Sequence, residues 1–426
     1  MDIPCEVSVP LPGTGSPEEP VVEMESVDTP PIKTRRSSSG PGCLHTINDK
    51  QKSTLFLLWN MLDAYFRHPY IKVSGEKLAE LGQSFLETGN VGGKAAASEH
   101  PLYLELYRFA ASDDLDTTLL RFLRARKWNV ITAFTAIVEC LIWRHEFGVD
   151  ALMRAGESRI DQGSLESGKG FVWGEDRDGR LVVYMRGRLH DKNAQTLEES
   201  IDYAVHFLEM ARSLRRHDEQ LLTVVIDMQG AGLASFDLPL AQAMGRFVQG
   251  CYPEVMGVCL VMNAPWIFWG FWSIVKNLLD PVIVAKFAFI KPAELVDYID
   301  PAQTPVDFGG RSSFRYHYFP DPKPVRAQID EMALTALYRK GKTFAELNRQ
   351  IHTNWDPSIV RSRNLVKAEL RIGYYLLMKP VYPQTIYHRW GICREDGSMD
   401  WSLYKGPAKR HLHLGELEQL RSSAPP

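Results

Sequence analysis

A small set of charged residues has the side-chain types that a binding site needs. They are Arg121, Arg124, Arg126, Lys127, Glu254 and Lys286. The first four form a basic cluster at the end of a predicted helix, where the helix dipole favours cations by about 0.3–1 kcal/mol each. Taken singly, each of these residues is better explained as an ordinary solvated charge than as part of a site. Their meaning depends on the elements that position them.

The sequence contains no recognised catalytic motif. GxxxxGK[ST], HExxH and GxSxG are absent, and His411 and His413 have no carboxylate or cysteine spaced to complete a metal site. Gly230–Ser235 resembles the dinucleotide-binding fingerprint, but Ser235 replaces its third glycine and a plain tight turn fits better. We therefore predict a protein without catalysis or cofactor. A dehydrogenase that uses Gly230–Ser235 is the enzymatic alternative.

The apolar stretch Tyr252–Ile290 has three interpretations: a membrane span over Gly257–Val275, a buried core, or the wall of a cavity for an apolar ligand. Asn263-Ala264-Pro265 interrupts it and divides it into a short strand, Val258–Met262, and a helix after the proline. No cluster of Lys or Arg flanks it closely, so a membrane span is disfavoured. The helix carries a block of aromatic residues, namely Trp266, Phe268, Trp269, Phe271 and Trp272.

Composition indicates a soluble protein of a reducing compartment. Apolar residues make up 45% and charged residues 24% of the chain, which is typical of globular proteins. A net charge of −3 gives no reason to expect nucleic acid as a partner. The six cysteines form no CxxC pair, and the N-terminus lacks the pattern of a signal peptide. We expect a cytoplasmic protein.

Periodicity divides the chain into a tail, helical regions and an α/β region. Residues 1–50 are predicted to be disordered, 51–112 and 113–150 helical, 151–320 α/β, and 321–426 a helical extension. Asp116 and Thr117 are the expected caps of the helix that carries the basic cluster. Strands are predicted at Gly170–Gly174, Leu181–Arg186, Leu221–Met228, Val258–Met262 and Lys286–Ile290. Their alternation with helices predicts a largely parallel sheet.

Several segments over residues 113–320 together resemble the CRAL-TRIO family of intracellular lipid-transfer proteins, especially its phosphatidylinositol-transfer branch. The segments are LLRFLRARKW (119–128), WRHEFGVD (143–150), DRDGRLVVY (176–184), VVIDMQG (224–230), YPEVMG (252–257), NAPWIF (263–268), LDPVIVAK (279–286) and PVDFGG (305–310). The order and spacing of these segments agree with the family. TIYHR (385–389) resembles the C-terminal extension of a subgroup.

The resemblance implies a fold and a site. The fold is a CRAL-TRIO N-terminal helical lobe packed on an α/β lobe, whose sheet floors an apolar lipid pocket under a gating helix at about residues 265–286. Arg126, with Lys127 beside it, Glu254 and Lys286 would hold the headgroup. A phosphodiester favours guanidinium and ammonium partners, and a carboxylate suits the ring hydroxyls. The aromatic block and Ile283 would belong to the gate and pocket.

The identity of the lipid depends on a few departures from the family pattern. Ile283 stands where a hydroxyl residue is often found, and Val183, Gly232 and Ala234 disfavour phosphatidylcholine. We predict a carrier of phosphatidylinositol that contacts membranes transiently, with a sterol, squalene or another hydrophobic lipid as an alternative ligand. For such a carrier the resemblance implies peripheral, reversible association with endomembranes of the ER, endosome or Golgi. The alternative function is a regulatory scaffold that presents its lipid to a lipid kinase or small GTPase, which the long terminal regions suggest.

Overall fold

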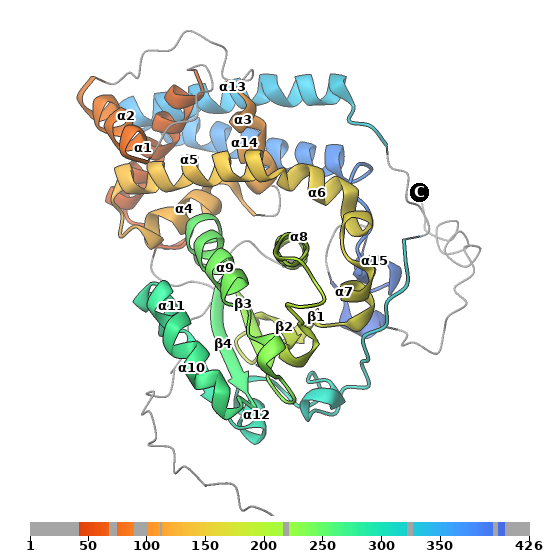
Figure 1. Cartoon of the computed structure of the whole chain (residues 1–426). Helices are drawn as coiled ribbons and strands as arrows, with labels where there is room; N and C mark the ends of the chain where they lie inside the picture. Colours follow the sequence, from red (N-terminus) through yellow and green to blue (C-terminus); the bar gives the residue numbers. More distant parts are fainter. Residues whose placement is uncertain are drawn as a thin grey trace, which may run out of the picture. The chain divides into compact units, whose positions relative to one another are not determined.

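A five-stranded sheet forms the centre of one lobe, and a second lobe is built from helices alone (Figure 1). The computed structural model describes residues 42–67, 75–88, 100–110, 113–215, 221–321, 327–394 and 399–404. All of them belong to the unit Thr34–Pro426. Most of the expected tail, His411, His413 and the expected loop at 90–98 lie outside the described residues.

The sheet confirms the predicted α/β class. Its strands are β1 (Gly170–Glu175), β2 (Leu181–Arg186), β3 (Leu222–Asp227), β4 (Met256–Met262) and β5 (Phe287–Ile290), arranged in chain order. β1 and β2 form an antiparallel pair, and the other neighbours are parallel. The largely apolar sequence of β3, LTVVID, is typical of an inner strand of a parallel sheet.

Helices connect the parallel strands. They are α8 (Leu197–Ser213), α9 (Leu238–Cys251), α10 (Trp266–Val275) and the short α11 (Pro281–Val284). Because the strands follow chain order, right-handed crossovers place these helices on one face of the sheet. The contacts of α9 with both α8 and α10 agree with this arrangement. The opposite face is covered in part by α12 (Leu295–Tyr298) and the residues around Phe308, which packs on Tyr184 of β2.

The helical lobe combines the N-terminal helices with the C-terminal extension. Its elements are α1 (Asp49–Phe66), α2 (Gly75–Thr88), α3 (Pro101–Ala110), α4 (Leu115–Ala125), α5 (Val130–Phe147), α6 (Val149–Ala155), α13 (Glu331–Thr353) and α14 (Pro357–Met378). α13 packs on α1, and α14 packs on α3 and α13. The helices of the lobe approach closely at Gly341, where a Cβ would lie only 1.9 Å from Tyr103 Oη.

A buried ion cluster joins α14 to the start of α4. The cap expected at Asp116 and Thr117 is wrong, because Asp114 Oδ1 accepts the backbone N–H groups of both residues at 2.9 and 3.2 Å. Asp116 instead accepts from Arg363 Nη2 at 2.5 Å and Lys367 Nζ at 2.8 Å. Burial raises the pKa of Asp116, but the two cations outweigh it and hold that pKa well below its usual value.

The chain after α14 covers the edge of the sheet. Two short elements, α7 (Gln162–Ser167) and α15 (Ile386–Arg389), lie near β1 in Figure 1. Tyr387 Oη accepts a hydrogen bond from Val172 N of β1 at 2.6 Å. Such cover protects an edge strand from pairing with another chain. Within the described ranges, no helix has the length and apolarity to cross a membrane.

Candidate functional site

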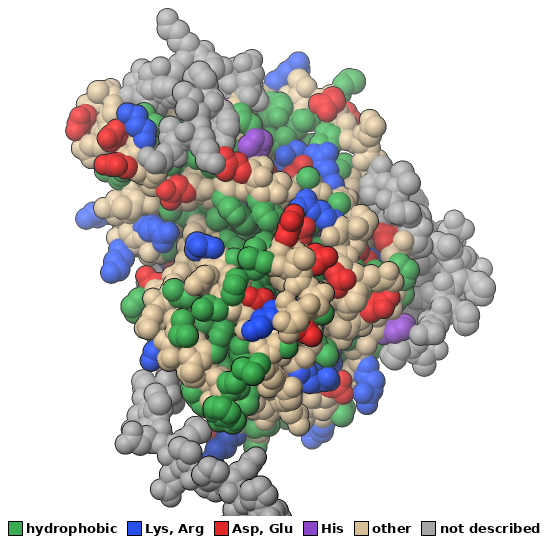
Figure 2. Space-filling view, viewed as in Figure 1, with side chains coloured by type: hydrophobic (Ala, Val, Ile, Leu, Met, Phe, Trp, Pro, Cys, Tyr) green, Lys and Arg blue, Asp and Glu red, His purple; other side chains and the backbone are tan. Residues whose placement is uncertain are grey.

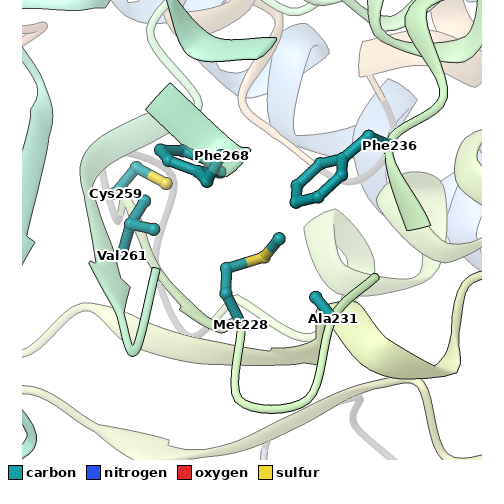
Figure 3. Packing of buried hydrophobic residues seen from close by; sticks show 6 residues of the cluster. All are labelled: Met228, Ala231, Phe236, Cys259, Val261 and Phe268. Carbon is teal, nitrogen blue, oxygen red and sulfur yellow. The ribbon is translucent and has the colours of Figure 1, made fainter. Parts of the chain in front are cut away.

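The face of the sheet beneath α10 carries an apolar cluster. Its buried members, shown in Figure 3, come from β4, α10 and the loop after β3, and are Met228, Ala231, Phe236, Cys259, Val261 and Phe268. Cα partners in neighbouring parallel strands direct their side chains to the same face. Val224 pairs with Cys259, and Cys259 pairs with Phe287, so one apolar row crosses three strands.

This face is less completely covered than the opposite one. Val224 and Ile226 are only half-buried, although β3 lies in the middle of the sheet. On the other face, Val225 and Leu260 are fully buried. An inner strand of a parallel sheet is normally buried on both sides. Apolar surface of β3 therefore remains partly accessible on the face that carries α10.

The predicted gate residues divide into an inner and an outer set. Phe268 is buried, and Trp269 and Trp272 lie over Phe289 and Phe287 of β5, with ring centroids 4.9 and 4.7 Å apart. Phe271 packs on Phe236 at 5.3 Å. Ile283 in α11 is half-buried, whereas Trp266 is 85% exposed. Four aromatic side chains thus hold α10 on the sheet, and one faces outward.

The outer surface of α10 and α11 is apolar. Its exposed members are Trp266, Ile274, Leu278 and Val282. Apolar side chains gather in Figure 2 over the region where Figure 1 places α10 and α11. A contiguous exposed apolar surface of this kind commonly marks an interaction with a protein or a membrane.

Glu254 is held by two arginines of α4. Arg124 Nε donates to Glu254 Oε2 at 2.5 Å, and Arg121 Nη1 donates to the Glu254 carbonyl oxygen at 2.5 Å. Glu254 has a φ of 54°, which is uncommon for a residue other than glycine, and these bonds stabilise it. Arg124 Nη1 also donates to the Gly42 carbonyl at 2.8 Å. These roles of Arg121 and Arg124 were not predicted from the sequence, although the i, i+3 spacing of the two residues places both on one face of the helix.

Arg126 and Lys127 lie in the turn that follows α4. Arg126 is half-buried and Lys127 is exposed, and neither side chain forms a hydrogen bond or ion pair with another described residue. Lys127 and Trp128 have φ values of 52° and 64°, so a left-handed turn carries the chain away from α4. The structure thus brings Arg124, and not Arg126, into contact with Glu254.

Lys286 lies at the same end of the sheet as Glu254. Its Nζ donates to the Met256 carbonyl oxygen at 2.8 Å, and Met256 is the first residue of β4. Lys286 itself directly precedes β5. Both residues therefore stand at the amino ends of parallel strands, beside the apolar face beneath α10.

A second buried charge cluster supports the turn at Tyr252–Glu254. Tyr252 Oη donates to Glu209 Oε1 at 2.5 Å, and Arg144 Nη1 donates to the same oxygen at 2.6 Å. Arg144 Nε also donates to Glu105 at 2.7 Å. Burial raises the pKa of Glu209, but Arg144 and Arg212 more than offset it and lower the pKa to about 2. The cluster links the helical lobe, α8 and the turn.

Among the described residues there is no metal-ligand cluster, and Gly230–Ser235 lacks the helix start of a dinucleotide-binding fingerprint. No group of three His, Cys, Asp or Glu among them is arranged to hold a metal ion. Gly230 has a φ of 74° in a turn after β3, and the short 3-10 helix Leu233–Ser235 follows it. The following α-helix begins only at Leu238, so Gly230–Ser235 does not form its N-terminus.

Comparison with known proteins identifies the family. Residues 77–139 match the CRAL/TRIO N-terminal domain, and residues 165–310 match the CRAL/TRIO domain. A CRAL-TRIO domain-containing protein of Schizosaccharomyces pombe is 32% identical over 298 residues, covering 66% of each chain. Phosphatidylinositol transfer protein CSR1 of Eremothecium gossypii is 34% identical over 244 residues, covering 55% of this chain and 56% of that protein.

The matches span about two thirds and just over half of these two relatives. The crystal structure of Sfh5 matches with a TM-score of 0.37 and 20% identity, over 41% of this chain and 66% of that one. The two domain matches and the relatives confirm the resemblance seen in the sequence. The protein is thus a member of the CRAL/TRIO family.

Proposed function

We propose that this protein binds one lipid molecule between its sheet and α10 and transfers it between membranes without catalysing a reaction. Phosphatidylinositol is the lipid that the chain favours. The observation that carries the proposal is the half-buried apolar face beneath α10, with Glu254 and Lys286 at one end of it. The printed name of the relative from Eremothecium gossypii, a phosphatidylinositol transfer protein, supports the choice of lipid.

Acyl chains would lie on the apolar face. Each buried methylene contributes about 0.8 kcal/mol, and a bilayer gives nearly the same. The site and the membrane are therefore close to balanced, and the movement of a cover decides the rate of exchange. α10 is the proposed cover, with hinges at Asn263–Pro265 and Asp280–Pro281.

The headgroup would lie among the charges at the amino ends of β4 and β5. Arg126 and Lys127 supply cations for the phosphodiester, and Lys286 adds a third. Glu254, oriented by Arg124, accepts hydrogen bonds from the ring hydroxyls. Ile283 supplies no hydroxyl, so the ligand would be recognised by charges more than by neutral hydrogen bonds.

Membrane contact would use the outer surface of α10 and α11. Trp266 is suited to the headgroup level of a bilayer because an indole ring is amphipathic. We propose peripheral, reversible association with endomembranes through this surface. Ile274 and Leu278, further along, would enter the acyl boundary as the cover moves.

The test combines the copurifying lipid with transfer between vesicles. Mass spectrometry of the purified full chain is expected to find phosphatidylinositol. Lys286→Ala and Glu254→Ala are each expected to lower its transfer by roughly tenfold to a hundredfold, since each removes one charge-assisted contact worth about 1.5–3 kcal/mol. Arg126→Ala tests the remaining cation. Lys291→Ala, an exposed lysine just after β5, is the matched control.

Two results would contradict the proposal. Protein that carries no extractable lipid would exclude a lipid carrier, and unchanged transfer by the Glu254 and Lys286 variants would exclude this headgroup site. A copurifying sterol or squalene, with transfer insensitive to both substitutions, would assign the apolar face to a neutral lipid instead.

A further inference from the structure

The outward face of α14 carries a row of exposed apolar side chains. Leu365 is 64% exposed, and Ile372 and Leu376 are each 59% exposed. These residues stand at positions i, i+7 and i+11, which fall on one side of an α-helix. Large aliphatic side chains that share one exposed helix face are unusual on a surface that meets only water.

The inward face of the same helix is fixed in place. Arg363, Lys367, Leu370 and Tyr374 are buried against the rest of the helical lobe. Arg363 and Lys367 both bind Asp116 of α4, so rotation of α14 would break buried ion pairs. The apolar row is therefore a permanent feature of the surface formed by the described residues.

Basic residues accompany the apolar row. Arg361 and Lys379 are exposed near the two ends of α14, and at 100° per residue both fall within about 40° of the Leu365 direction. Glu369, a carboxylate of the same helix near the row, pairs with Lys340 of α13. Residues 331–379 contain nine Lys or Arg and four Asp or Glu. Arg363 and Lys367 are buried against Asp116, which leaves seven cations and four carboxylates for the rest of the segment. This segment thus carries an excess of cations in a chain with a net charge of −3.

We propose that the outward face of α14 docks on bilayers that carry anionic headgroups. A row of apolar side chains with cations at its two ends suits the membrane–water interface. There the apolar side chains enter the acyl boundary, and the cations contact lipid phosphates. The cations beside the row match the negative charge of anionic headgroups. A protein partner would match them equally well only if its own surface were acidic.

This surface is distinct from the one over α10. α14 belongs to the helical lobe, whereas α10 lies at the far end of the α/β lobe, and α5 and α9 stand between them in Figure 1. Two elements that are separated in a picture are at least as far apart in space, so α14 and α10 do not lie side by side. The inference therefore stands whether or not a lipid binds beneath α10, and it gives the protein a second place at which a membrane is held.

The experiment measures cosedimentation of the full chain with phosphatidylcholine vesicles, with and without phosphatidylserine. The triple variant Leu365→Ser, Ile372→Ser and Leu376→Ser is expected to lower the apparent affinity by on the order of tenfold or more, because three side chains leave the interface. Leu86→Ser with Leu197→Ser, two apolar residues exposed elsewhere, is the matched control. The control is expected to bind like the wild type.

A second variant tests the charges without touching the apolar row. Arg361→Ala with Lys379→Ala is expected to weaken binding to phosphatidylserine vesicles by on the order of tenfold, at about 1 kcal/mol per cation, and to leave binding to pure phosphatidylcholine unchanged. Because both side chains are exposed, this variant also keeps the test valid if the triple variant unfolds.

Several outcomes would overturn the inference. If both variants bind vesicles with the affinity of the wild type, the outward face of α14 has no role in membrane binding. If the wild type is a dimer and the triple variant is a monomer, the face is an interface with a second copy of the chain. Equal binding to vesicles with and without phosphatidylserine would exclude recognition of anionic lipid. The lipid that copurifies with each variant is expected to be unchanged, which separates this inference from the function proposed above.

Discussion

Single charged residues determine the shape of the turn at Tyr252–Glu254. Glu254 adopts a positive φ, which costs free energy for a residue with a Cβ. Arg121 and Arg124 bind its carbonyl and carboxylate, while Glu209 fixes the phenol of Tyr252. The turn is therefore held at both ends by residues outside it, an arrangement that would pre-organise Glu254 for the proposed headgroup.

The ionised state of Glu209 contributes stability that depends on pH. Its pKa is lowered from 4.5 to about 2, so this contribution is present above about pH 4.5 and is lost as the pH falls towards 2. Glu209→Gln is expected to lower the free energy of unfolding at pH 7 by about 3 kcal/mol, with a smaller difference near pH 2. Urea unfolding at several pH values measures this.

The control for that experiment is Glu198→Gln. Glu198 is an exposed carboxylate in the first turn of the same helix, α8. We expect its substitution to leave stability nearly unchanged at every pH. An equal loss of stability in both variants would contradict a special contribution to folding from the buried ion pairs of Glu209.

At the scale of elements, α10 has two faces with different tasks. Phe268 is buried in the cluster above β4, while Trp266 at the start of the helix points outward. Aromatic contacts on the inner face hold the helix on the sheet, and they are distributed over several rings. The proposed cover can lift only if those contacts are replaced, and a lipid bilayer offers equally apolar surroundings.

Substitutions on the two faces of α10 are expected to separate stability from membrane binding. Phe268→Ala should lower the free energy of unfolding by about 3 kcal/mol, since it leaves a cavity in a packed cluster. Trp266→Ala should leave the unfolding midpoint unchanged and weaken binding to vesicles. Thermal unfolding and vesicle cosedimentation are measured on both variants. A loss of stability in Trp266→Ala would contradict the assignment of its ring to the outer face.

At the scale of the whole molecule, the C-terminal extension is part of the helical lobe. Trp59 of α1 and Phe344 of α13 pack edge to face at 5.0 Å, and Tyr107 of α3 stacks on Tyr374 of α14 at 5.0 Å. Arg363 adds the buried ion pair with Asp116. The extension therefore contributes to the same core as the N-terminal helices.

Removal of residues 321–426 is expected to destabilise the protein, because it exposes this shared core and leaves Asp116 buried without a cation. Arg363→Ala alone should cost about 3–5 kcal/mol for the same reason. Arg361→Ala, an exposed residue on the same helix, is the control and should be neutral. Chemical unfolding of the three proteins measures the effect.

The regulatory alternative makes the opposite prediction for this deletion, namely that lipid transfer in vitro survives it. A truncated protein with wild-type stability and transfer would show that the extension is a separate module. It would then favour a scaffold over a carrier whose two lobes depend on the extension.

The sequence by itself determined the class of the fold and the break between β4 and α10. Strand-like apolar runs alternate with helices, and Asn263-Ala264-Pro265 separates β4 from α10, because proline cannot continue a strand into a helix without a break. These signals are local. The match of several ordered segments to one family then named the expected site residues.

Only the tertiary structure decided which charges meet. Arg124 of α4 contacts Glu254 and Arg126, the C-cap of that helix, does not, because side chains two positions apart point about 200° apart around a helix. Which of the two arginines faces Glu254 follows from the packing of α4 on the turn that holds Glu254. The pairing of Arg363 with Asp116 joins residues far apart in the chain, and no local pattern encodes such a distance. Long-range pairs follow from the packing of whole elements, which sequence periodicity describes only one helix or strand at a time.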